Sequence, residues 1–170
     1  MPTVIPGRFT AQRDEPFVVF LIGMRINRFW QFKKWLPVVN AMPKMMQVLL
    51  SQPERGLLGS ESFMRIWPLE IIMISYWRSF DDLEHFARSK DDPHLSAWQD
   101  YQRNIAADGT AGVWHETYLI EPGSYECVYA NMPVFGLAAA TTHIPAVNQR
   151  ASARRRLQAG HGAEIVEIRS

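Results

Sequence analysis

The segment that most constrains the fold is residues 17–26, which are apolar at almost every position. Its sequence, FVVFLIGMRI, is rich in β-branched and aromatic residues, and Arg25 is its one charged residue. A strand sends alternate side chains to opposite faces, so a nearly continuous apolar run indicates that both faces are covered. We therefore predict a buried strand with helices on one face and further protein on the other.

The next segments predict a helix followed by a hairpin. Apolar residues recur at helical spacing from about Trp30 to Leu50. Pro37 and Pro43 predict a kink or a helix broken into two parts. Residues 53–56 end this helix, and residues 57–66 and 70–77 are expected to form a β-hairpin.

A second helix and a fourth strand follow. Ser79 is expected to cap the helix, with Asp82 at the acidic position of a capping box. Asp92 and Pro93 indicate that the helix breaks near Lys90 and restarts. Residues 113–120 predict a strand, and residues 125–130 a fifth extended segment after a turn.

This order, β-α-β-β-α-β, predicts an α+β protein with a ferredoxin-like antiparallel sheet and both helices on one face. Covering the other face of so apolar a strand requires a partner, and a homodimer joined through the sheet faces is the simplest one. The expected organisation is a polar leader at 1–16, a dimeric α+β barrel domain with a C-terminal cap at 17–140, and a solvated, Arg-rich tail at 141–170.

Composition excludes several classes of function. Eighteen Lys and Arg against seventeen Asp and Glu give a net charge of +1, so no chain-wide field attracts nucleic acid or a membrane. Cys127 is the one cysteine, which leaves no internal disulfide or cysteine metal cluster. Neither a signal peptide nor a membrane-spanning apolar run occurs, so a cytoplasmic protein is expected. Phosphate-loop, nucleophile-elbow and His-x-x-x-His patterns are also missing from the sequence.

The first candidate for chemistry is the segment DPHLSAWQDY, residues 92–101. His94, Trp98 and Tyr101 share one helix face, where a histidine among aromatic rings can act as a base near neutral pH. The alternative is a structural histidine in the first turn of a helix, bonded to a carbonyl group.

The second candidate is the segment WHETY, residues 114–118, in the fourth strand. Alternation places His115 on one face, and Glu116 with Trp114 and Tyr118 on the other. We predict that His115 faces a pocket, whereas Glu116 packs beneath the helices, paired with an Arg or a Tyr hydroxyl. An edge strand in water would also account for both polar residues.

These segments, together with SYWRSFDDLEHFARSKDDPHLSAWQDY and GSYECVYANMP, resemble a monooxygenase-like domain family of unknown function. That family is similar to the antibiotic biosynthesis monooxygenases and includes a fungal, fumagillin-pathway relative assigned to terpenoid oxygenation. The resemblance implies a homodimeric barrel with a pocket between sheet and helices in each protomer. It also implies that Trp77 matches a recurrent pocket tryptophan, and that Trp98 stands near the position of the axial histidine of the haem-degrading members.

Three functions are compatible with these observations. The first is a monooxygenase without a cofactor, acting on a small apolar or aromatic substrate with His115, His94 and Glu116 as catalytic candidates. The second is a haem enzyme, an oxygenase or one like aldoxime dehydratase, with His115 or His94 as axial ligand. The third is a non-catalytic dimer that binds a small ligand. The expected pocket residues are Trp77, Phe86, Trp98, Tyr101, Tyr118, Tyr129 and Asn131.

Overall fold

The computed structural model describes residues 2–89 and 108–159, apart from the side chains of residues 41–45 and 48. The chain forms two compact units. The larger unit is Val18–Tyr118, and the end unit joins the two ends of the sequence, Met1–Phe17 and Leu119–Ser170. The boundary predicted after residue 16 lies one residue from the beginning of the larger unit, whereas the unit boundary near the other end falls after Tyr118 and not after residue 140.

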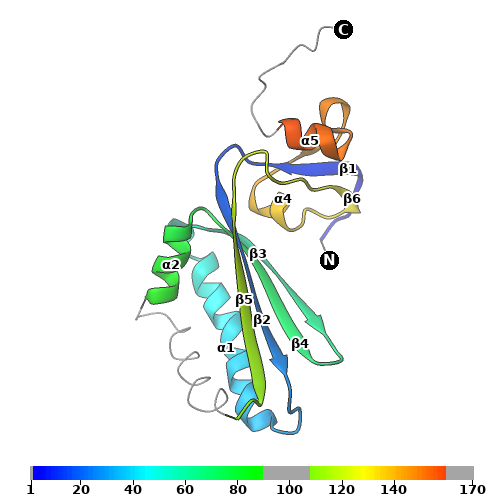
Figure 1. The fold of residues 1–170 in the computed structure, drawn as a ribbon. Coiled ribbons are helices and arrows are strands. Elements are labelled where there is room, and N and C mark those ends of the chain that lie inside the picture. Colours follow the sequence, from blue (N-terminus) through cyan, green and yellow to red (C-terminus); the bar gives the residue numbers. More distant parts are fainter. Residues whose placement is uncertain (1, 90–107, 160–170) are drawn as a thin grey trace. The chain divides into compact units, whose positions relative to one another are not determined.

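The larger unit is built on a four-stranded antiparallel sheet (Figure 1). Its strands are β2 (Phe17–Ile26), β3 (Leu57–Arg65), β4 (Glu70–Trp77) and β5 (Ala111–Ile120), in the order β3-β4-β2-β5. Helices α1 (Phe32–Leu50) and α2 (Phe80–Arg88) and the short helix η1 (Pro53–Arg55) connect them. This is the predicted α+β, ferredoxin-like order. Among the described residues, no helix is both long and apolar enough to cross a membrane.

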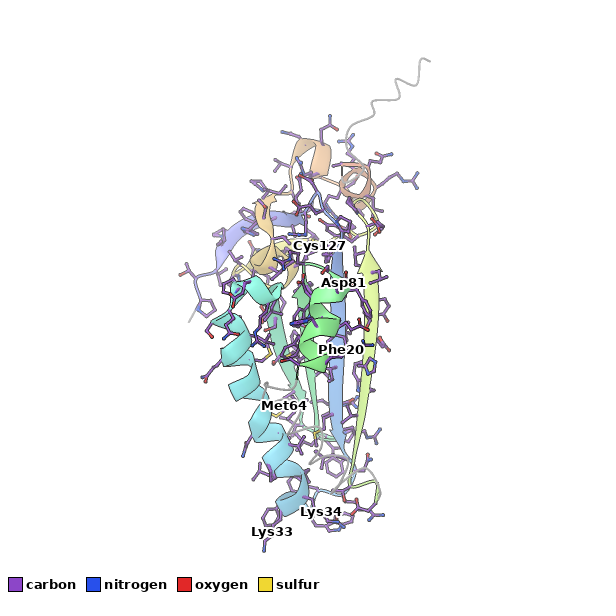
Figure 2. The ribbon with its side chains drawn as sticks, turned by 90° about the vertical axis from the view of Figure 1, so that its left-hand side faces the viewer. Phe20, Lys33, Lys34, Met64, Asp81 and Cys127 are labelled. Atoms are coloured by element: carbon purple, nitrogen blue, oxygen red, sulfur yellow. The ribbon has the colours of Figure 1, made fainter. Side chains whose placement is uncertain are left out.

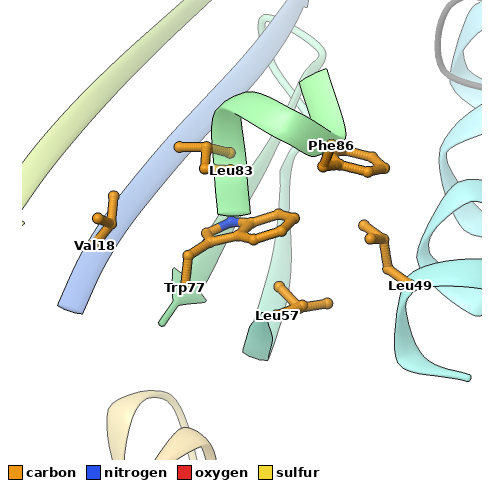
Figure 3. Close-up of a cluster of buried hydrophobic side chains, with 6 residues drawn as sticks. All are labelled: Val18, Leu49, Leu57, Trp77, Leu83 and Phe86. Carbon is orange, nitrogen blue, oxygen red and sulfur yellow. The ribbon is translucent and has the colours of Figure 1, made fainter. Parts of the chain in front are cut away.

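The core of the larger unit lies between this sheet and its helices, in two clusters. One is centred on Trp77 and contains Val18, Leu49, Leu57, Leu83 and Phe86 (Figure 3). The other contains Met24, Ile26, Trp35 and Ala111. Because both clusters combine helix residues with even-numbered residues of β2, α1 and α2 cover the same face of the sheet.

Helix α1 corrects one prediction. Of the two predicted alternatives, a kink or a broken helix, the break is wrong: α1 is a single helix of 19 residues with Pro37 and Pro43 inside it. Each proline removes one backbone hydrogen bond, and its ring crowds the carbonyl group of the preceding turn. Trp35 near one end and Leu49 near the other are both buried in the core, so tertiary packing holds the helix across its weak points.

The cap of α2 is confirmed. Ser79 precedes the helix in an extended conformation, and its Oγ accepts a hydrogen bond from the Asp82 backbone N–H at 3.1 Å. The Asp82 carboxylate in turn receives two hydrogen bonds from the Arg78 guanidinium, at 2.9 and 2.8 Å. Helix α2 ends at Arg88, close to the predicted break near Lys90. The predicted restart at Asp92 and Pro93 lies outside the described residues.

The end unit shows that residues 141–159 of the predicted tail are folded, whereas residues 160–170 lie outside the described residues. Strand β1 (Ile5–Gln12), from the predicted leader, is the central strand of a second sheet in the order β6-β1-β7. Strands β6 (Tyr129–Met132) and β7 (Thr142–Pro145) pair with it, and α4 (Leu137–Ala140), η3 (Asn148–Arg150) and α5 (Ala153–Ala159) complete the unit. Two contacts hold the segments that were predicted as leader and tail within this unit. The Phe9 ring stacks on the His143 ring with centroids 4.3 Å apart, and the buried Arg156 side chain forms an ion pair with Glu126.

Candidate functional site

His115 lies on β5, on the same face of the sheet as the core. The odd-numbered residues Ala111 and Val113 of that strand pack in the cluster that includes Trp35 of α1. The His115 ring lies 5.7 Å from the ring of Phe20 on β2, tilted by 38°. The residue is exposed in the described structure. An imidazole is thus held beside an aromatic ring on the face of the sheet that meets the helices, whereas the prediction had placed Trp114, Glu116 and Tyr118 on that face.

Two hydrogen bonds fix the strand that carries Phe20. The indole N–H of Trp77 donates to Ser75 Oγ at 2.9 Å, and Ser75 Oγ donates to the Phe20 carbonyl oxygen at 3.1 Å. Trp77 and Ser75 are almost completely buried, so water does not compete for these bonds. Figure 2 labels Phe20 on β2. The ring that contacts His115 is therefore anchored through its backbone to the core.

Glu116 corrects a further prediction. It is exposed, and it lies on the face of the sheet opposite the helices rather than beneath them. The predicted partner type is correct, because Tyr118 donates a hydrogen bond to Glu116 Oε2 at 2.6 Å. This bond raises the pKa of the Tyr118 hydroxyl above its usual value. His115 and Glu116 do not share a site.

The buried carboxylate on that opposite face belongs to Glu70, a residue that sequence reasoning missed. Glu70 is 8% exposed and accepts a hydrogen bond from the Trp114 indole at 3.2 Å. Arg65, across the β3–β4 hairpin, forms an ion pair with the same carboxylate. An acidic residue that opens an otherwise apolar strand, five positions after an arginine, is the signal that could have revealed this pair.

The other predicted pocket residues of the larger unit fall into two groups. Trp77 and Phe86 are both core residues, with ring centroids 5.4 Å apart. His94, Trp98 and Tyr101 lie outside the described residues. The structure therefore brings together Trp77 and Phe86, and it places His115 beside Phe20, a ring that the prediction did not include.

Tyr129 and Asn131 lie on β6 in the end unit, where both bond to the backbone. The Tyr129 hydroxyl accepts from the Ala138 N–H at 3.4 Å, and Asn131 Oδ1 accepts from the Gly7 N–H at 3.0 Å. Asn131 adopts a left-handed conformation with φ of 53°, which asparagine tolerates better than most residues. Both side chains thus have a structural role within this unit.

The end unit also contains two hollows. A cavity of about 20 Å³ beside Cys127 is large enough for about one water molecule. A larger one of about 400 Å³ is polar and is lined by Gln12, Arg13, Asp14, Glu15, Thr141 and Thr142. Arg13 Nε is buried there without a hydrogen-bond partner among the described residues. Within residues 2–89 and 108–159, no three His, Cys, Asp or Glu side chains gather in an arrangement that could hold a metal ion.

Comparison with known proteins gives one family match. The family described as "Monooxygenase af470-like" matches residues 17–137. No curated protein sequence matches the chain significantly.

Several solved structures are similar to part of the chain. SnoaB, a cofactor-independent oxygenase from Streptomyces nogalater, is 10% identical over 60% of this chain and 90% of its own, with a TM-score of 0.43. A dimeric protein of unknown function and ferredoxin-like fold from Bacteroides fragilis is 14% identical over 61% and 96%, with a TM-score of 0.46. A dimeric ferredoxin-like protein from an uncultured marine organism is 14% identical over 62% and 96%, with a TM-score of 0.45.

Proposed function

The chain belongs to the Monooxygenase af470-like family, and from that premise we propose that it is a monooxygenase acting on a small apolar or aromatic substrate. The observation that carries the proposal is the pairing of His115 with Phe20. It combines an exposed base with an aromatic ring on the face of the sheet that holds the core.

The proposed substrate is an electron-rich molecule with an activated CH₂ group. His115 removes one proton from that carbon, since an imidazole accepts and releases protons near neutral pH. The carbanion passes one electron to dioxygen, and the two radicals combine to a peroxide. Protonation gives a hydroperoxide, which loses water to leave a carbonyl group. One oxygen atom of dioxygen enters the product and the other leaves as water, so the reaction is R₂CH₂ + O₂ → R₂C=O + H₂O.

Phe20 supports this chemistry by its position. Its ring provides an apolar surface against which a flat or aliphatic substrate can lie next to the imidazole. The buried bonds from Trp77 through Ser75 hold the Phe20 backbone, so this surface is fixed before the substrate arrives. In this proposal the substrate anion itself reduces dioxygen, and no cofactor is required.

The test is oxygen uptake by protein treated with a chelator. The substrate panel contains anthrone-like CH₂ acids and terpenoids that carry an activated CH₂ group, the latter suggested by the resemblance to the fumagillin-pathway enzyme. We expect one dioxygen consumed per product. His115→Asn should lower kcat by a factor of about 100 or more, whereas His85→Asn, at an exposed histidine of α2, should leave turnover unchanged.

Two outcomes would contradict the proposal. Loss of turnover on chelation would show that a metal is needed. Equal turnover of the His115 and His85 variants would remove His115 as the base, and His94→Asn would then test the second histidine candidate. Glu116 lies on the other face, so Glu116→Gln is expected to retain most of the turnover.

Titration with hemin separates this proposal from a haem enzyme. A shift of the Soret band that disappears in His115→Asn or in His94→Asn would identify an axial ligand and favour a haem oxygenase or dehydratase. Binding of panel compounds without any oxygen uptake would instead indicate a non-catalytic small-ligand protein.

We also propose a homodimer, formed through the face of the sheet opposite α1. Leu21, Ile72 and Ile74 are only half-buried on that face, and Phe63 is 44% exposed. Light scattering should give about twice the chain mass of 19.6 kDa. Ile74→Glu should give a monomer, whereas Ser62→Glu, at an exposed position on the other side of β3, should not. A wild-type monomer at micromolar concentration would refute the dimer.

A further inference from the structure

One end of the larger unit exposes large apolar side chains from two separate segments. The loop between β2 and α1 exposes Trp30 by 73%, and the turn between β3 and β4 exposes Ile66 by 79% and Trp67 by 85%. Phe29, Phe32 and Met64 beside them are each more than half exposed. We refer to these six residues as the apolar tip. Soluble proteins rarely leave so many large apolar groups in water together, and such patches mark sites of interaction.

Backbone and core contacts place the two segments at the same end of the unit. The Ile26 N–H at the end of β2 donates to the Leu69 carbonyl in the hairpin turn at 2.9 Å. Leu69 also packs in the cluster that contains Trp35 of α1, and the Phe29 ring lies 5.8 Å from the Trp35 ring. Loop and turn therefore project from one end.

Positive charge surrounds the apolar tip. Arg25, Arg28 and Lys33 are exposed there, and Figure 2 shows Lys33 and Lys34 at the beginning of α1. Lys34 is paired with Asp108, and Arg65 with Glu70. The described residues 25–36, 63–70 and 108–110 thus contain five positively charged side chains and only two carboxylates. The net charge of the whole chain conceals this local excess.

We propose that the apolar tip docks on an anionic lipid surface. Tryptophan rings favour the boundary between headgroups and acyl chains, and exposed Lys and Arg are attracted to acidic headgroups. Four of the six apolar residues stand on the loop and the turn, which can enter the headgroup layer while the rest of the sheet stays outside; Phe32 is the first residue of α1, and Met64 lies near the end of β3.

A lipid surface fits these charges better than a second copy of the chain. A two-fold contact through the tip would bring Arg25, Arg28 and Lys33 against the same three cations of its partner. Like charges brought together in an interface oppose association. An acidic surface instead neutralises all three. Docking on lipid requires no turnover, so its test is independent of the proposed oxygenation.

The test is co-sedimentation of the full chain with vesicles. Vesicles of phosphatidylcholine alone are compared with vesicles that also contain phosphatidylserine. We expect binding to the anionic vesicles only. Raising KCl from about 0.1 M to about 1 M should release the protein, because the Debye length falls from about 10 Å to about 3 Å.

Variants locate the contact. The double variant Trp30→Ala/Trp67→Ala should weaken binding at least about tenfold by removing apolar area. Arg28→Glu/Lys33→Glu should weaken it at least as much. The matched controls lie on α2 of the same unit: Phe80→Ala, at a ring 45% exposed, and Arg88→Glu. Circular dichroism verifies that each variant is folded.

Three results would overturn the proposal. One is failure to bind anionic vesicles at low salt. Another is an equal loss of binding in the α2 controls. The third is evidence that the apolar tip binds a different partner. If the tip variants have half the mass of the wild type, the partner is a second copy of the chain. If the protein binds single-stranded DNA more tightly than vesicles, the partner is nucleic acid.

Discussion

Gly23 of β2 lies directly beneath the indole of Trp114 on β5. A β-carbon at residue 23 would overlap the ring at Nε1, Cε2 and Cζ2. The missing side chain therefore lets the indole lie flat against the neighbouring strand, with its N–H directed to Glu70. On this face the sheet depends on the absence of one methyl group.

Gly23→Ala is expected to destabilise the protein by about 1–3 kcal/mol, the usual cost of overpacking a filled site. Displacing the indole would also leave the buried Glu70 carboxylate without one of its donors. Urea unfolding measures the change. Gly112→Ala on the adjacent strand is the control, since the added carbon would meet only Asn27 Nδ2 at 3.7 Å. Equal effects of the two substitutions would refute the packing argument.

Gly56→Ala tests a turn in which a positive φ angle and a close contact with Asp82 both require glycine. Gly56 has φ of 84°, and a β-carbon there would lie 2.5 Å from Asp82 Cγ. Gly109 has φ of 68° but no atom within 4 Å of such a carbon, so Gly109→Ala reports backbone strain alone, about 1 kcal/mol. We expect Gly56→Ala to cost clearly more in thermal or urea unfolding. A smaller cost than at Gly109 would contradict the observed contact.

Asp82 predicts how stability changes in acid. Hydrogen bonds from Arg78 hold the pKa of Asp82 below its usual range. The folded state therefore binds this proton more weakly than the unfolded state. The stabilisation is fully present above the ordinary aspartate pKa of about 4 and is lost as pH falls through the lowered value.

Asp82→Asn should accordingly lower stability near neutral pH and flatten its decline below about pH 4. Urea midpoints measured from neutral to acidic pH would show both changes. Asp81→Asn keeps the first turn of α2 but is not bonded to Arg78, and it should leave the decline intact. A steeper acid decline in Asp82→Asn than in wild type would reverse the assigned sign.

Arg156 predicts how firmly α5 is held. Its side chain is 6% exposed, with Nε donating to Glu126 at 2.7 Å and Nη1 to the Arg150 carbonyl at 2.9 Å. Arg156→Met should cost about 1–3 kcal/mol, because it removes the charge-assisted hydrogen bonds that the buried guanidinium donates to Glu126 and to the Arg150 carbonyl. Limited proteolysis should then cut sooner between residues 146 and 159. The control is Arg154→Met, at an exposed neighbouring residue, which the protease should cleave at the wild-type rate.

The sequence predicted those helices and strands whose signals lie entirely within their own residues. The strand at residues 17–26 matches β2 at both ends, and the cap at Ser79 is present, since an apolar run and a capping pair need no distant partner. Strand β1 escaped prediction for the opposite reason. Its sequence, IPGRFTAQ, is polar and irregular, and it is a strand only because β6 and β7, far along the chain, pair with it.

The candidate site was predicted in part, and the reason lies in the phase of alternation. Alternation correctly separated His115 from Glu116, but it does not tell which face of a strand meets the helices. The bulk of Trp114 suggested the helix side, whereas Gly23 provides its place on the opposite face. Phe20 could not be paired with His115 because the register between β2 and β5 is a property of the assembled sheet.

The central position of β1 in the end unit has a consequence for synthesis of the chain on the ribosome. Both partners of β1, strands β6 and β7, are encoded more than a hundred residues after it. By the time residue 120 has emerged, the four strands β2 to β5 exist as a contiguous stretch of polypeptide. β1 is thus translated before the other described strands but is among the last of them to be paired, and until residue 145 has left the exit tunnel its two edges have no complete partners.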